Sequence, residues 1–186
     1  MATPSLTDFI AEIHRSPYMA VLVVTGGGAQ ALADLFAVPG ASRTVLEALV
    51  PYGDRSMREF LGREPEQAAS AETATALARK AYERALGLMP DDDVPVLGIA
   101  CTAALVTDRP RKGEHRAHVA VCRGGPVEVR SVTLKKNARD RAGEERVVAN
   151  LVLSNMGRAC GLDAAMCDAL LPTGEELMES NFDREL

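Results

Sequence analysis

Residues 19–28 read MAVLVVTGGG, an apolar run that ends in three glycines. A run of this length and β-branched content predicts a buried strand. The glycines allow a turn with positive φ, and they leave backbone N–H groups at the start of a following helix open to an anion. Thr25, Gly26, Gly27 and Gly28 are therefore candidate ligand contacts. A tight strand-to-helix turn also uses glycine for structural reasons alone, so the motif leaves both interpretations open.

The order of the flanking elements predicts the fold class. Apolar residues recur at helical spacing or in short β-rich runs, and Gly124-Gly125 between two such runs predicts a hairpin. We expect helices over 5–14, through 31–36, and over 70–86 and 144–160, and strands over 18–24, 44–52, 94–100, 116–123 and 127–134. Because the elements alternate first and pair as a hairpin later, the sequence predicts a three-layer α/β fold with a mixed β-sheet.

Composition and charge exclude some classes of partner. The 186 residues are 47% hydrophobic, which is enough for one domain with a well-filled core. The net charge of -5 and the pI of 5.3 predict that neither nucleic acid nor an anionic membrane is a partner, because no basic face is available to replace counterions. Residues 109–112 (RPRK) are a local exception, which we interpret as a solvated loop unless it folds over a ligand.

The cysteines and histidines predict a reduced protein without a metal. No C-x-x-C motif is present among the cysteines, which are Cys101, Cys122, Cys160 and Cys167. No i, i+4 pair suited to zinc occurs among the histidines, which are His14, His115 and His118. The chain opens without a signal-peptide pattern, and its apolar runs are too short to span a bilayer. We therefore expect a cytoplasmic protein with no metal, no cofactor and no membrane insertion.

Three short motifs resemble a known family. Residues 38–42 (VPGAS), 50–54 (VPYGD) and 61–62 (LG) are similar to landmarks in the C-terminal domain of the competence/damage-inducible protein CinA, a family that includes nicotinamide mononucleotide amidohydrolases. Ser42 and Tyr52 fit the Gly-Ser-Ser and Tyr-Ser-Asn landmarks of that family without a gap.

Further matches follow in the same order along the chain. They are Ser70-Ala71-Glu72 at a helix start, Gly98-Ile99-Ala100 at a Gly-Ile-Ala-Gly-Pro loop, Pro110 with Gly113 at the start of a strand, and Arg146 on the last helix. Each motif is short, and it is the ordered series that carries the resemblance. The series implies a CinA C-terminal-like domain over residues 1–162.

The resemblance implies amidohydrolase chemistry with Ser42 and Tyr52 as catalytic residues, but two departures argue against activity. Val23 stands where the family's Glu-Ser-Cys-Thr-Gly-Gly loop has serine, and Met57 replaces the family's lysine. A serine is a poor nucleophile until a neighbouring base takes its proton, and a nearby ammonium lowers the pKa of a tyrosine that serves as this base. Methionine supplies neither charge nor proton transfer.

We therefore predict a divergent CinA-like domain that lacks the amidohydrolase site and retains a pocket for a phosphate compound or a pyridine nucleotide. Its ligand contacts are expected from residues 25–28, Gly98, Arg111 and Arg146. One alternative is an active nicotinamide mononucleotide amidohydrolase that uses Ser42 and Tyr52. Another is a regulatory or interaction domain of a larger nucleotidyltransferase-type protein.

Cys101 supports a separate hypothesis about catalysis. It follows the predicted strand over 94–100 beside a pocket loop, and His115 or His118 on the next strand could lie within its reach. A cysteine paired with a histidine can form an activated thiolate. The alternative is a buried cysteine that packs as a small apolar side chain, with two surface histidines.

The last segment, residues 163–186, lies outside the resemblance and is acidic. We expect an acidic tail, either as a solvated helix from Gly174 onward or as a linker. Small and apolar residues on the Ala-rich helix over 70–86 and on the hairpin further predict surfaces that are shared between the subunits of a homo-oligomer.

Overall fold

The fold is built on a six-stranded mixed β-sheet. A computed structural model describes residues 5–89, 93–109, 112–171 and 176–183. The strands lie in the order β2-β1-β3-β4-β5-β6 and are β1 (Met19–Thr25), β2 (Val45–Leu49), β3 (Val96–Ala104), β4 (His115–Cys122), β5 (Val127–Leu134) and β6 (Glu176–Phe182). β1 is parallel to both β2 and β3, and the later pairs are antiparallel.

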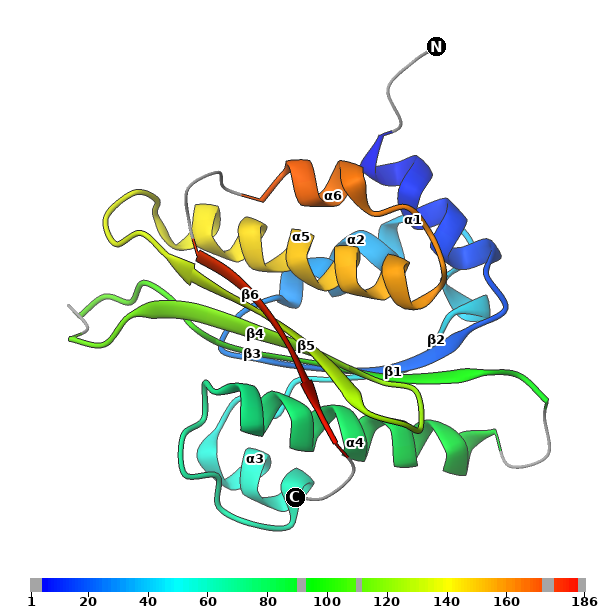
Figure 1. The fold of residues 1–186 in the computed structure, drawn as a ribbon, viewed down its shortest axis with the longest axis horizontal. Coiled ribbons are helices and arrows are strands. Elements are labelled where there is room, and N and C mark those ends of the chain that lie inside the picture. Colours follow the sequence, from blue (N-terminus) through cyan, green and yellow to red (C-terminus); the bar gives the residue numbers. More distant parts are fainter. Residues whose placement is uncertain (1–4, 90–92, 110–111, 172–175, 184–186) are drawn as a thin grey trace.

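Helices cover both faces of this sheet (Figure 1). One face carries α1 (Leu6–Arg15), α2 (Ala29–Ala37), α5 (Arg141–Ala159) and α6 (Ala165–Ala169), and the other carries α3 (Asp54–Leu61) and α4 (Ala71–Leu88). A short 3-10 turn, η1 (Ala41–Arg43), precedes β2. The predicted three-layer α/β fold with a mixed sheet is confirmed. No helix within the described ranges is both long and apolar enough to cross a membrane.

β1 is buried on both faces, as its continuous apolar sequence predicts. Leu22 and Val24 pack in the core on the α5 side, whereas Val21 and Val23 pack in the core on the α4 side. A strand that is covered by helices on both faces needs apolar side chains at every position. Burial of each valine or leucine contributes about 1.5–3 kcal/mol, so β1 anchors both layers.

α5 is the central helix of its layer. The sequence predicts a helix with one inward stripe, but every residue from 147 to 157 is buried. The reason is that α5 contacts α1, α2 and α6 as well as the sheet. At its start, the Asp140 side chain accepts a hydrogen bond from the Gly143 N–H at 2.8 Å, which caps the helix.

The Ala-rich stripe of α4 packs on the sheet within the chain. Its members are fully buried and are Ala74, Ala78, Ala81 and Ala85. Gly98 of β3 permits this approach, because a Cβ at position 98 would lie 2.1 Å from the Ala78 carbonyl oxygen and 2.3 Å from the Tyr82 nitrogen. These four alanines therefore contact the sheet of their own chain, and a homo-oligomer that uses other surfaces of α4 or of the hairpin stays a prediction.

Residues beyond 163 join the sheet and its helical layer, which corrects the expectation of a solvated helix or a linker. α6 packs on α5, and β6 forms an antiparallel ladder with β5. The buried Arg130 of β5 joins these parts: its Nη1 donates to Asp168 Oδ1 at 3.1 Å, and its Nε lies 3.0 Å from Glu179 Oε1. Gly174, where the helix was expected to begin, lies outside the described residues.

Replacing Gly98 by alanine tests the close contact between α4 and the sheet. The added methyl group overlaps the Ala78 carbonyl, so α4 has to shift, and we expect the free energy of unfolding to fall by about 1–3 kcal/mol. Gly87→Ala is the matched control, because nothing lies within 4 Å of a Cβ at that position of α4. The control should be neutral or stabilising by up to about 1 kcal/mol. Urea denaturation measures both variants, and equal stabilities would contradict the contact.

Candidate functional site

The candidate site lies at the carboxyl ends of the three parallel strands. The chain leaves β1 through α2 on one face of the sheet to reach β2, and it leaves β2 through α4 on the other face to reach β3. Connections that part toward opposite faces leave a crevice between the strand ends, where open α/β sheets commonly bind ligands. The glycine turn at residues 26–28 follows β1 at this point.

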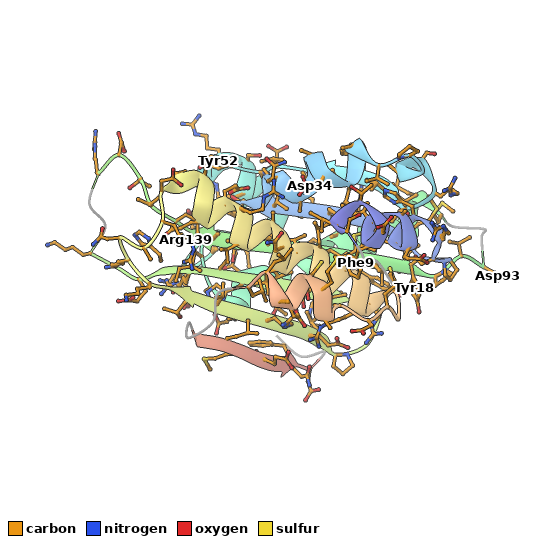
Figure 2. All side chains as sticks on the ribbon, turned by 90° about the horizontal axis from the view of Figure 1, so that it is seen from above. Phe9, Tyr18, Asp34, Tyr52, Asp93 and Arg139 are labelled. Carbon is orange, nitrogen blue, oxygen red and sulfur yellow. The ribbon has the colours of Figure 1, made fainter. Side chains whose placement is uncertain are left out.

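Two clefts open here and share Thr25, Gly26 and Tyr52. The main cleft, ≈ 560 Å³, lies between α2, the end of β2 and the start of α5, and its lining includes Val24, Ala29, Gln30, Val50, Arg141 and Glu145. The minor cleft, ≈ 280 Å³, lies toward α3 and the start of β4, and its lining includes Asp54, Met57, Gln67, Ala69, Ala104 and Arg116. Tyr52 lies at the molecular surface with 64% of it exposed (Figure 2).

Gly26 and Gly28 are required by the packing of the turn. Both have positive φ, 75° and 91°. A Cβ on Gly26 would lie 1.9 Å from the Ala103 carbonyl oxygen, and one on Gly28 would lie 3.1 Å from Cys101 Sγ. Glycine is therefore needed at these positions for a structural reason, because the turn lies too close to β3 to leave room for a side chain. Thr25 Oγ1 also donates to the Pro51 carbonyl at 3.2 Å and ties the turn to the end of β2.

Two side chains from the start of α5 bind the backbone of this turn. Arg141 Nη2 donates to the Gly26 carbonyl at 2.9 Å, and Glu145 Oε1 accepts from the Gln30 N–H at 3.0 Å. Gln30 lies in the first turn of α2, whose N-cap residue Gly28 has no side chain to offer. The helix end that the sequence predicts as an anion site therefore already holds a carboxylate of the chain itself.

Val23 and Met57 lie in the same apolar cluster. These are the two positions that the CinA resemblance aligns with the family's serine and lysine. Val23 is fully buried and Met57 is 5% exposed, and both pack in the core on the α4 side of the sheet. Met57 also lines the minor cleft together with Tyr52. Both positions thus lie on the same side of the sheet, with Met57 beside Tyr52, and neither carries a hydroxyl or ammonium group.

Ser42 is not brought to Tyr52. Ser42 belongs to η1, before β2, whereas Tyr52 follows the carboxyl end of that strand. A five-residue strand spans about 16 Å, so the two hydroxyl groups lie at opposite ends of β2. Ser42 is exposed and lines neither cleft. The pairing of Ser42 with Tyr52 in one catalytic site is therefore not supported by the geometry.

The other predicted ligand contacts have different surroundings. Gly98 lies near the start of β3, under α4, and lines neither cleft. Arg146 of α5 forms an ion pair with Asp34 of α2. Arg111 lies outside the described residues. Of the predicted set, Thr25, Gly26 and Gly27 line the main cleft.

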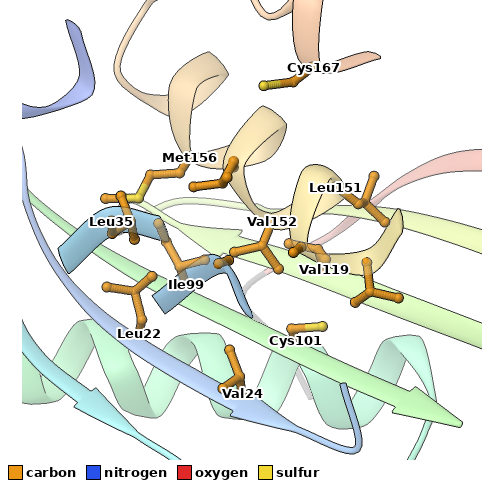
Figure 3. Packing of buried hydrophobic residues seen from close by; sticks show 14 of the residues in the cluster. Leu22, Val24, Leu35, Ile99, Cys101, Val119, Leu151, Val152, Met156 and Cys167 are labelled. Atoms are coloured by element: carbon orange, nitrogen blue, oxygen red, sulfur yellow. The ribbon is translucent and has the colours of Figure 1, made fainter. Parts of the chain in front are cut away.

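Cys101 contacts neither histidine. Its side chain lies among buried apolar residues on the α5 side of the sheet (Figure 3), whereas His118 lies on the α4 side because side chains alternate along β4. His118 Nδ1 lies 2.7 Å from Ser131 Oγ, and His115 Nδ1 lies 2.7 Å from Glu144 Oε1. Burial raises the pKa of the Cys101 thiol, which disfavours a thiolate. These contacts give no support to an activated Cys–His pair.

Three site residues were not predicted: Arg116, Arg141 and Glu145. Arg141 and Glu145 are spaced i, i+4 and resemble an ordinary surface pair on a helix. One signal pointed toward such a contact: Gly28 has no side chain to cap α2, which leaves the first N–H groups of the helix for a distant side chain, water or a ligand. The described residues hold no group of three His, Cys, Asp or Glu side chains that could bind a metal ion.

The fold is similar to that of solved CinA-superfamily proteins. The competence/damage inducible protein CihA from Agrobacterium tumefaciens has a TM-score of 0.60 at 19% identity, covering 91% of this chain and 99% of that one. CinA-superfamily proteins from Enterobacter cloacae and Klebsiella pneumoniae have TM-scores of 0.63 and 0.61 at 17% identity, covering 86% and 87% of this chain and 95% and 99% of theirs. No protein-family model matches the sequence, and neither does any curated protein. The CinA resemblance is confirmed at the level of the fold.

Thiol labelling tests the surroundings of Cys101. The thiols of Cys101, Cys122 and Cys167 are buried, whereas Cys160 is partly exposed. In the native protein, iodoacetamide should therefore modify Cys160 first and leave Cys101 unmodified until the chain unfolds. Peptide mass spectrometry at successive times gives the order. Preferential modification of Cys101 would show an accessible, activated thiolate and contradict the burial.

Proposed function

We propose that this CinA-like domain binds a small nucleotide-type ligand, with a pyridine nucleotide as the first candidate, and does not hydrolyse it. The observation that carries the proposal is the pair of clefts at the carboxyl ends of β1, β2 and β3, which meet at Tyr52. The volume of the main cleft, ≈ 560 Å³, falls within the range of about 300–1,000 Å³ that is typical of small-molecule sites.

The two clefts offer complementary chemistry. The main cleft has apolar walls from Val24, Ala29 and Val50, and the exposed ring of Tyr52 suits a planar ring that stacks on it. The minor cleft contains Arg116, whose Nε donates to the Ala69 carbonyl at 3.0 Å and so holds the guanidinium at the cleft wall. A guanidinium is the side chain best suited to a phosphate group.

The lining residues support binding without hydrolysis. Among the described residues that line the two clefts there is no serine, histidine, lysine or cysteine. The Thr25 hydroxyl donates to the Pro51 carbonyl, and position 23 is a fully buried valine. A hydrolytic site needs a nucleophile or an activated water next to a base of suitable pKa. Tyr52 beside Met57 lacks the neighbouring ammonium that would prepare it for that task.

A thermal-shift panel tests binding. Nicotinamide mononucleotide should raise the melting temperature, because a ligand at 100 times its Kd adds about 2.7 kcal/mol to the stability of the native state. Tyr52→Ala should weaken this binding by roughly 2- to 13-fold, since an aromatic contact is worth about 0.5–1.5 kcal/mol. Phe36→Ala is the matched control, because Phe36 is a similarly exposed aromatic residue, 57%, that lines neither cleft.

Other mononucleotides and inorganic phosphate complete the panel and define which part of the ligand is recognised. Flat responses to every compound at millimolar concentration would contradict the proposal and favour a regulatory or interaction domain.

An ammonia-release assay tests the absence of hydrolysis. We expect no release from nicotinamide mononucleotide above background, and Ser42→Ala should change neither this result nor the thermal shift, because Ser42 lies at the far end of β2. Turnover on the order of 1 per second, within the ordinary range for enzymes, would restore the enzymatic alternative if Ser42→Ala or Tyr52→Phe abolished it.

A further inference from the structure

We propose that Glu145 determines the charge selectivity of the main cleft by denying the N-terminus of α2 to phosphate. The proposal rests on the proposed function in one respect, namely that the main cleft is a ligand site. It adds the class of group that the cleft accepts beside α2: a neutral or cationic group and not a phosphate.

The contacts of Glu145 place its carboxylate where an anionic ligand would otherwise bind. Oε1 accepts the N–H of Gln30 at 3.0 Å, and Oε2 lies so near Gly27 that a Cβ there would be 3.3 Å away. Gly28 supplies no cap of its own. Free N–H groups and the helix dipole at such an end attract anions. Here the Glu145 carboxylate accepts from one of these N–H groups and places its negative charge at the positive end of the helix dipole. Its side chain is 19% exposed and lines the main cleft.

The neighbouring charges keep Glu145 in this position and do not reverse its effect. Arg141 Nη2 lies 4.0 Å from Glu145 Oε2, but the same nitrogen donates to the Gly26 carbonyl at 2.9 Å. On α2 itself, Asp34 is a second carboxylate, which accepts from Gln30 Nε2 at 3.0 Å and pairs with Arg146. A phosphate at the start of α2 would have to displace one carboxylate and would lie near another.

The charge distribution gives a ligand one preferred orientation across the site. A planar or cationic part fits the main cleft between Tyr52 and Glu145, whereas a phosphate fits the minor cleft beside Arg116. The glycine turn between the clefts then serves packing and does not itself bind phosphate. Glu145 is a specificity-determining residue, because it changes which group can enter and takes no part in bond making.

The test uses inorganic phosphate as the probe and the amide resonance of Gln30 as the reporter. Glu145→Ala frees the start of α2. Glu145→Gln removes the negative charge and leaves a neutral amide oxygen, which accepts from the Gln30 N–H more weakly than a carboxylate does and can be displaced by phosphate. Glu128→Gln is the control, because it changes the net charge by the same amount. Glu128 lies on β5, where it pairs with Arg123 at an exposed site and lines neither cleft. Phosphate titrations of the full chain are followed by amide NMR shifts and by melting temperature.

In the wild type and in Glu128→Gln, the Gln30 amide should not respond to millimolar phosphate. In both Glu145 variants it should respond, with phosphate binding tighter by roughly tenfold or more, the size of one charge-assisted hydrogen bond. A wild-type Gln30 amide that responds as strongly as the variants would overturn the proposal, and so would Glu145 variants that remain silent. If Glu145→Ala does not fold, Glu145→Gln alone decides.

The outcome is independent of the nucleotide panel. Phosphate binding gained at Gln30 supports the role of Glu145 even where no nucleotide binds the wild type. Nucleotide binding that is unchanged by Glu145→Gln, with Gln30 silent toward phosphate, retains the proposed function and removes this inference.

Discussion

The turn between β1 and α2 is held by two side chains from α5, and the site depends on that attachment. Arg141 donates to the Gly26 carbonyl, and Glu145 accepts from the Gln30 N–H. One helix thus supplies the hydrogen-bond partners of both backbone groups. Gly26 lets the turn lie directly against β3, where any Cβ would overlap the Ala103 carbonyl. Because α5 is itself enclosed by α1, α2, α6 and the sheet, the turn is fixed to the most buried helix of the protein. The wall that the two clefts share is therefore connected through α5 to the core of the protein.

A fold can retain a cleft while the chemistry within it changes, because backbone geometry and side-chain function depend on different residues. In this chain the clefts follow from the strand order and from the connections on opposite faces of the sheet. The chemistry that the CinA resemblance implies would depend on a serine and a lysine at positions 23 and 57. Val23 and Met57 both pack in the apolar core on the α4 side. An isolated serine or lysine in that core would be costly, since a buried polar group needs a partner. Replacement of both groups by apolar side chains removes that cost and leaves Tyr52 at the rim.

The sequence was sufficient to predict the layers but not the contacts between distant segments. Local signals identified β1, the β4–β5 hairpin and the Ser70 cap of α4, whose side chain accepts from the Thr73 N–H at 3.1 Å. β6 was missed because its sequence, ELMESNF, is acidic and lacks β-branched residues; its glutamate at 179 is accommodated by Arg130 from β5. Ser42 and Tyr52 appear close in sequence, yet a strand separates them. Cys101 and His118 lie on adjacent strands, yet strand alternation places them on opposite faces. The contact of Gln30 with Glu145 spans 115 positions, and no local pattern encodes it.

Glycine-rich turns after a buried strand are strong indications of an anion site only where the following amides lack partners. The present turn has the expected sequence and position, and its helix begins at a glycine with no side-chain cap. A residue of a different helix, α5, nevertheless changes the character of this turn. The Glu145 carboxylate accepts from the Gln30 N–H and brings negative charge to the positive end of α2. The preference of such a site therefore depends on which atom already occupies the helix end. In this protein that atom is a carboxylate oxygen, and for this reason our proposal assigns a phosphate to Arg116 in the minor cleft.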